Sequence, residues 1–118
     1  MVMSKDKHRV VCDRVGADFL ASPDGLVVGL ADNARTGLTP LNGLRTEPAG
    51  NATGWFIWGG TSFSQADDFF KPVHVAHLME LCPDVLPYFG LPPGWRFLVE
   101  GAYEDIWFDR SLLDEPQD

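Results

Sequence analysis

Two pairs of neighbouring carboxylates are the first groups in this chain whose type and spacing could support chemistry. Asp67 is followed by Asp68, and Glu104 is followed by Asp105. Carboxylates act as general acids or bases when burial or a close like charge shifts their pKa. Both pairs fall in segments predicted to be loops, where helix-entry and solvent-exposed roles are expected. No serine lies in a GxSxG setting, so we expect no catalytic residue and no enzyme.

Two histidines and two cysteines are the remaining candidates for chemistry. His74 and His77 are three residues apart on a predicted helix, a spacing that can chelate a metal ion. Glu80 is the only carboxylate nearby on the same face, and no HExxH or CxxC pattern is present. Cys12 and Cys82 are far apart and have the character of buried thiols. We therefore expect no metal site, no disulfide and no cofactor.

Length and composition favour one globular domain. The chain has 118 residues and is 45% hydrophobic, which suffices for a single core. We expect one domain over residues 1–118, with flexible tails at 1–7 and 114–118. No apolar run approaches the roughly 18 residues of a membrane span. The start of the chain lacks the apolar core of a signal peptide, so a cytoplasmic location is expected.

The negative charge is concentrated in the second half of the chain. Residues 1–60 contain six basic and six acidic residues, whereas residues 61–118 contain three basic and eleven acidic ones. An acidic face repels nucleic acid, because phosphate binding needs lysine and arginine. It attracts basic partners and accelerates their association. Acidic surface that merely maintains solubility is the alternative.

A glycine-bounded aromatic run at residues 54–60 is predicted to be the central strand. Strands are also predicted at 8–13 and 26–31, and turn chemistry at 22–25 favours an antiparallel pair between them. Residues 14–21 form either a bend or a short helical turn. Residues 32–53 are rich in turn signals and are predicted to be a long loop, which either binds a ligand or is a plain connection.

One helix and one hairpin complete the prediction. Residues 72–82 have helical spacing of apolar residues, with a proline in the first turn. Residues 95–100 and 106–109 alternate as two antiparallel strands around a loop at 101–105. The predicted fold is α+β: a mostly antiparallel sheet of about five strands with one main helix packed on one face.

The aromatic residues divide between core and surface. Core packing is the favoured interpretation for Phe56, Phe97 and Phe108, whereas Trp58 and Trp107 are ambiguous between core and surface. A stacking platform for single-stranded nucleic acid would need interleaved basic residues, which this half lacks. An exposed tryptophan beside carboxylates would instead make a binding hot spot for a basic protein.

Four short stretches between residues 54 and 113 form a recognisable pattern: residues 54–57, the acidic residues Asp67 and Asp68, Pro83-Asp84-Val85-Leu86-Pro87-Tyr88, and Leu91-Pro92-Pro93-Gly94. Through these stretches, residues 54–113 resemble immunity-protein family 33 of bacterial polymorphic-toxin systems. The resemblance implies a small cytoplasmic protein that binds a cognate toxin domain and occludes its active site. On that reading the contact surface comprises Trp58, Asp67, Asp68, Glu104, Asp105 and Trp107. The alternative is a small-ligand-binding or regulatory domain that uses residues 32–53 and the tryptophans.

Overall fold

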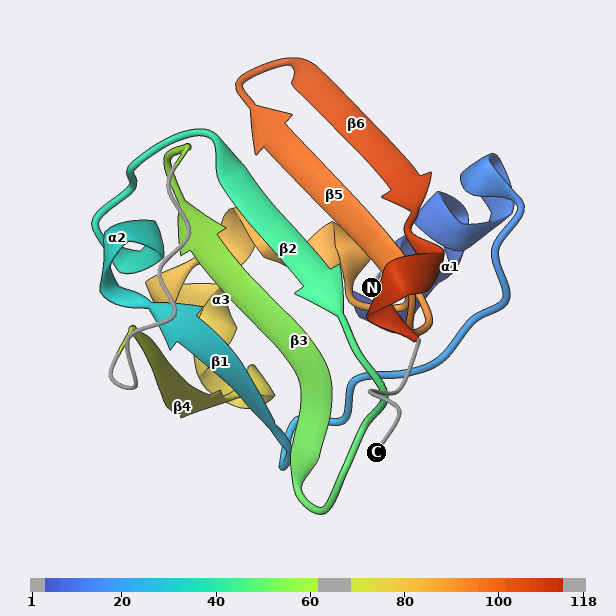
Figure 1. Ribbon diagram of the computed structural model, residues 1–118, viewed down its shortest axis with the longest axis horizontal. Helices are drawn as coiled ribbons and strands as arrows, with labels where there is room; N and C mark the ends of the chain where they lie inside the picture. The colour runs from blue at the N-terminus through green and yellow to red at the C-terminus, as the bar shows by residue number, and fades with distance from the viewer. Residues whose placement is uncertain (1–3, 62–68, 114–118) are drawn as a thin grey trace.

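The computed structural model describes residues 4–61 and 69–113, which form one six-stranded sheet with short helices. The strand order is β4-β1-β3-β2-β5-β6 (Figure 1). The strands are β1 (Val27–Ala31), β2 (Leu41–Arg45), β3 (Ala52–Gly59), β4 (Phe70–His74), β5 (Trp95–Glu100) and β6 (Tyr103–Phe108). β1 pairs with β3 in parallel, and the other neighbouring pairs are antiparallel.

The helices gather on one face of this sheet. The longest is α1 (Ser4–Val15), and α3 (Leu78–Leu81) and the 3-10 helix η2 (Pro83–Tyr88) lie on the same side (Figure 1). Of the remaining short elements, α2 (Asp32–Arg35) connects β1 to β2, and η1 (Val75–His77) continues β4 into α3. The last one, η3 (Arg110–Leu112), follows β6 near the end of the described chain. We call the opposite side of the sheet the open face. The α+β class is confirmed, but the sheet is mixed and has six strands, and no single main helix covers it.

The predicted central strand is confirmed. β3 lies in the interior of the sheet, and its Trp55 and Ile57 are 1% and 0% exposed. The Trp55 ring stacks on Phe89 at 4.9 Å between ring centroids, and its indole N–H donates a hydrogen bond to Ser22 Oγ at 3.1 Å. Trp55 therefore joins the sheet to Ser22 and Phe89, which lie before and after β3 in the sequence.

The predicted strand at 8–13 is wrong, because these residues belong to helix α1. Val11 and Cys12 are buried against the core, whereas Val10 is 62% exposed. This one-sided burial suits a helix packed on η2, and such packing overrides the strand preference of β-branched residues. The antiparallel pair predicted over 8–31 is therefore absent, and the strand at 26–31 pairs instead with β3 and β4.

The predicted long loop at 32–53 is also wrong. It contains α2 and β2, and β2 lies between β3 and β5. Asn42 and Gly43 resemble a turn in sequence but occupy this inner strand. Gly43 lets the Phe97 ring cross the strand, and the Asn42 amide donates to the carbonyls of Pro40 and Gly60. The apparent turn residues thus serve close packing and hydrogen bonding.

The predicted helix at 72–82 is replaced by β4, η1 and the four-residue α3. Pro72 lies in β4, an edge strand, where its missing N–H removes no essential ladder bond. Val75, Leu78 and Cys82 are buried as helical spacing predicts, but Met79 is 62% exposed. The apolar pattern therefore located three of the four predicted buried residues, although the chain forms several short elements instead of one helix.

A buried arginine links segments that are distant in sequence. Arg45 at the end of β2 is 1% exposed, and no acidic residue pairs with it among the described side chains. Its guanidinium donates to four backbone carbonyls, at distances of 2.8 to 3.1 Å: Leu20, Ala21, Thr53 and Leu91. Burial lowers its pKa to about 10, so the group remains charged at neutral pH.

We expect Arg45→Met to lower the free energy of unfolding by about 3 kcal/mol or more, because it leaves buried carbonyls without donors. Urea denaturation followed by tryptophan fluorescence measures this change. Arg35→Met, at an exposed arginine 3.7 Å from Asp32, is the matched control and should change stability by less than about 0.5 kcal/mol. Equal stability of the two variants would contradict the role assigned to Arg45.

We expect Gly43→Ala to destabilise the fold by about 1–3 kcal/mol through overpacking. A Cβ atom at this position would lie 2.2 Å from Phe97 Cε2 and 3.0 Å from Ile57 Cδ1. Gly25→Ala is the control, since nothing lies within 4 Å of its added Cβ. Thermal unfolding of the two variants should separate them clearly, and a Gly43→Ala protein as stable as Gly25→Ala would refute the packing argument.

Candidate functional site

The β5–β6 hairpin carries three of the six predicted contact residues. Its strands pair from Trp95 with Phe108 to Glu100 with Tyr103, so the loop contains only residues 101 and 102. The longer loop predicted at 101–105 is therefore wrong, and Glu104 and Asp105 are strand residues. Because side chains alternate along a strand, the two neighbouring carboxylates lie on opposite faces of the sheet.

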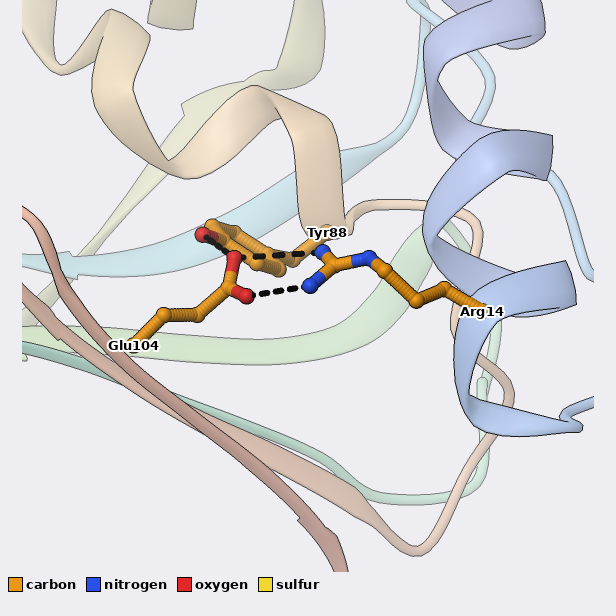
Figure 2. A network of polar contacts seen from close by, with 3 residues as sticks. All are labelled: Arg14, Tyr88 and Glu104. Atoms are coloured by element: carbon orange, nitrogen blue, oxygen red, sulfur yellow. Dashed lines mark hydrogen bonds and ion pairs between the residues drawn. The ribbon is translucent and has the colours of Figure 1, made fainter.

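Glu104 faces the helices and is held by two distant residues (Figure 2). The Arg14 guanidinium of α1 donates to both carboxylate oxygens, with distances of 2.6 Å from Nη1 to Oε1 and 3.3 Å from Nη2 to Oε2. The Tyr88 hydroxyl of η2 donates to Oε2. Three donors thus converge on one carboxylate, and they fix the hairpin against α1 and η2.

The ionisation of this group follows from its partners. Hydrogen bonds from Arg14 and then Tyr88 lower the pKa of Glu104 below its ordinary value. Burial, followed by the neighbouring Glu104, raises the pKa of Tyr88 well above that of a free phenol. At neutral pH the carboxylate is therefore ionised and the phenol protonated, which is the state that the donor geometry requires.

A hollow of about 410 Å³ lies between the hairpin and η2. It is lined by three carboxylate side chains, by two tyrosines, and by smaller residues: Asp84, Glu100, Glu104, Tyr88, Tyr103, Thr39, Leu41, Val99, Gly101 and Ala102. Thr39 Oγ1 donates to Glu100 Oε2 at 3.0 Å. No lysine or arginine lines this hollow, so it is an acidic concavity beside the hairpin.

Asp105 and Trp107 lie on the open face. Arg96 of β5 lies 5.4 Å from the centroid of the half-buried Trp107 ring and bridges to Asp109 at 3.0 Å. Tyr103, on the same face of β6, is 61% exposed. The open face of the hairpin therefore presents two aromatic residues beside the exposed carboxylate of Asp105.

Trp58 does not provide the exposed tryptophan that alternation allowed. It lies on the open face of β3, opposite Asn42 of β2, but only 5% of its surface is exposed. Its ring meets Phe70 of β4 edge-on, with 6.3 Å between ring centroids. Trp58 and Trp107 share a face but are separated by β2 and β5, so they form no common aromatic pair.

Several residues of the site were missed by the sequence analysis, and two that it named cannot be placed. Arg14, Tyr88 and Glu100 come from three distant segments, and no local pattern links them. Tyr88 did belong to the motif that carried the family resemblance. Asp67 and Asp68 fall outside the described residues, so their proposed role stays a prediction.

Metal binding finds no geometric support in the described part of the chain. His74 ends β4 and His77 ends η1, with 5.7 Å between their ring centroids. Within residues 4–61 and 69–113, no group of three or more His, Cys, Asp or Glu side chains is arranged to hold an ion. Over the same ranges, no helix is both long and apolar enough to cross a membrane. Cys12 and Cys82 are buried free thiols, as predicted.

We expect Glu104→Gln to lower the free energy of unfolding at neutral pH by about 1 kcal/mol, because it loses the ion pair with Arg14. The folded-state pKa of Glu104 lies below its unfolded-state value, so its contribution is present above the unfolded pKa and is lost as pH falls through the folded pKa. Urea titrations from neutral pH into the acid range should show the two proteins converging. A difference that is independent of pH would contradict an ionic origin.

The family comparison agrees with the sequence resemblance and extends it toward the N-terminus. The family model described as the Imm33-like domain matches residues 7–109, which include most of α1, the whole sheet and the acidic hairpin. No curated protein and no solved structure matches the chain. The match covers most of the 118 residues and confirms the suspected relation to immunity-protein family 33. The chain belongs to the Imm33-like domain family.

Proposed function

We propose that this protein is an immunity protein that binds a cognate toxin domain and neutralises it by covering the active site. The observation that carries the proposal is the Imm33-like match over residues 7–109. The protein acts by binding, without catalysis and without a cofactor, in the cytoplasm where the toxin would otherwise act. Its partner is a protein, and its acidic surface disfavours nucleic acid.

The acidic β5–β6 hairpin is the contact surface that the geometry supports best. Asp105 is exposed, and Tyr103 and the half-buried Trp107 flank it on the open face. Aromatic residues beside charged groups are the composition of binding hot spots. Glu104 is already held by Arg14 and Tyr88, so this end of the hairpin loses little conformational freedom when a partner binds.

Electrostatics supports a basic toxin surface as the target. Toxins that act on nucleic acids or nucleotides need a basic cleft to hold phosphate. Carboxylates such as Glu100 and Asp105 can occupy such a cleft in place of phosphate and accelerate association. Glu104 remains part of the proposed surface as the carboxylate that Arg14 and Tyr88 hold in place beside them. Asp67 and Asp68 remain part of the proposed surface on the same charge argument. Trp58 presents little area of its own and supports the open face from within the sheet.

The geometry gives less support to the small-ligand alternative. That alternative required a pocket lined by residues 32–53, Trp58 and Trp107, but β2 places the middle of the segment inside the sheet. Neither tryptophan lines the acidic hollow. We therefore pursue the immunity function alone.

The test is protection of a susceptible bacterial strain that expresses the toxin domain encoded in the neighbouring reading frame. Co-expression of the wild-type protein should restore growth. Asp105→Lys should weaken binding to the purified toxin domain by about tenfold or more, chiefly through slower association at low salt. Asp18→Lys makes the same charge change at an exposed residue far along the chain and should leave binding and protection unchanged. Failure of the wild-type protein to protect would refute the immunity function.

A further inference from the structure

The β6 strand forms one edge of the sheet and has no neighbour on its outer side among the described residues (Figure 1). The opposite edge is different, because β4 carries Pro72 and so lacks one donor. β6 runs for six residues without proline, lysine or a register shift against β5. Such an edge is a ready template for another strand.

The hairpin geometry identifies which backbone groups face outward. The two-residue loop has φ of +60° at Gly101 and no positive φ at Ala102, the pattern of a type II′ turn. In such a hairpin Glu100 and Tyr103 form a hydrogen-bonded pair, and bonded pairs then alternate along the ladder. The N–H and C=O groups of Glu104, Ile106 and Phe108 therefore point away from β5. Within residues 4–61 and 69–113 they have no other backbone partner.

The side chains on this edge favour one kind of occupant. Tyr103 and Phe108, at the two ends of β6, are 61% and 48% exposed. Glu104 and Asp105 lie between them in β6. The acidic hollow, which Glu100 lines, adjoins the Tyr103 end of the strand. A second copy pairing in antiparallel fashion would bring the acidic residues of both chains together, which disfavours self-association. A strand that carries lysine or arginine would meet opposite charges instead.

We propose that the toxin domain is captured by strand addition: a basic strand of the partner pairs with the outer edge of β6 and extends the sheet. This inference rests on the proposed immunity function and specifies how its contact is made. Main-chain hydrogen bonds to Glu104, Ile106 and Phe108 provide binding energy that does not depend on the side chains of the added strand. Asp105 and the flanking aromatic residues then select a basic sequence over a neutral or acidic one.

Amide hydrogen exchange, measured by NMR on the full ¹⁵N-labelled chain with and without the purified toxin domain, tests this mode. We expect at least tenfold slower exchange at the amides of Glu104, Ile106 and Phe108 in the complex. The amides of Tyr103, Asp105 and Trp107 already bond to β5 and serve as internal controls with smaller changes. A complex that forms without added protection at the three outward amides would overturn strand addition while leaving the immunity function intact.

A synthetic peptide of alternating lysine and valine tests the edge independently of the toxin, with a glutamate–valine peptide as its control. If only the lysine peptide protects the three outward amides, the result supports strand addition at this edge. Failure of the toxin domain to bind would refute the immunity function and would leave that peptide result standing. Asp105→Lys should abolish this protection and Asp18→Lys should not. Equal protection by both peptides, protection by neither, or protection that rises with protein concentration alone would overturn the proposal.

Discussion

The buried guanidinium of Arg45 is the interaction on which the rest of the structure depends. Its four carbonyl partners tie β2 to β3 and to the segments near Leu20 and Leu91, which connect to α1 and follow η2. A charge this deeply buried is tolerated because all of these bonds are made at once. The two helical segments are thereby fixed on the same face of the sheet, beside the Trp55 ring.

The fixed positions of α1 and η2 also determine how the β5–β6 hairpin is held near its loop. Because α1 and η2 are fixed on the sheet, Arg14 and Tyr88 reach Glu104 from two directions. One carboxylate of the acidic hairpin, Glu104, is therefore ion-paired and held in place, whereas Asp105, its neighbour on the other face, remains exposed. The hairpin is thus held rigidly on its helix side and carries an exposed charge on its open face. Such a surface suits recognition of a basic partner with little loss of conformational entropy.

The sequence predicted the α+β class, the central strand at 54–60 and the strand at 95–100, because long apolar runs and strict alternation depend on local burial. It failed where tertiary contacts overrule local chemistry. Gly43 resembles a turn residue yet admits the Phe97 ring in an inner strand, and Val11 prefers a strand yet packs in α1. Of the candidate site, the acidic pair at 104–105 could be found from residue types alone. Its partners Arg14 and Tyr88 could not, because only the folded chain brings them within reach.

We propose that this acidic protein of the Imm33-like family neutralises its toxin by covering the toxin's active site. The most direct measurement is the activity of the purified toxin domain titrated with this protein at several substrate concentrations. We expect complete inhibition at a one-to-one ratio, with an apparent affinity that falls as the substrate concentration increases, because substrate and inhibitor compete for one site. Inhibition that is unaffected by substrate concentration, or no inhibition at a stoichiometric ratio, would contradict it.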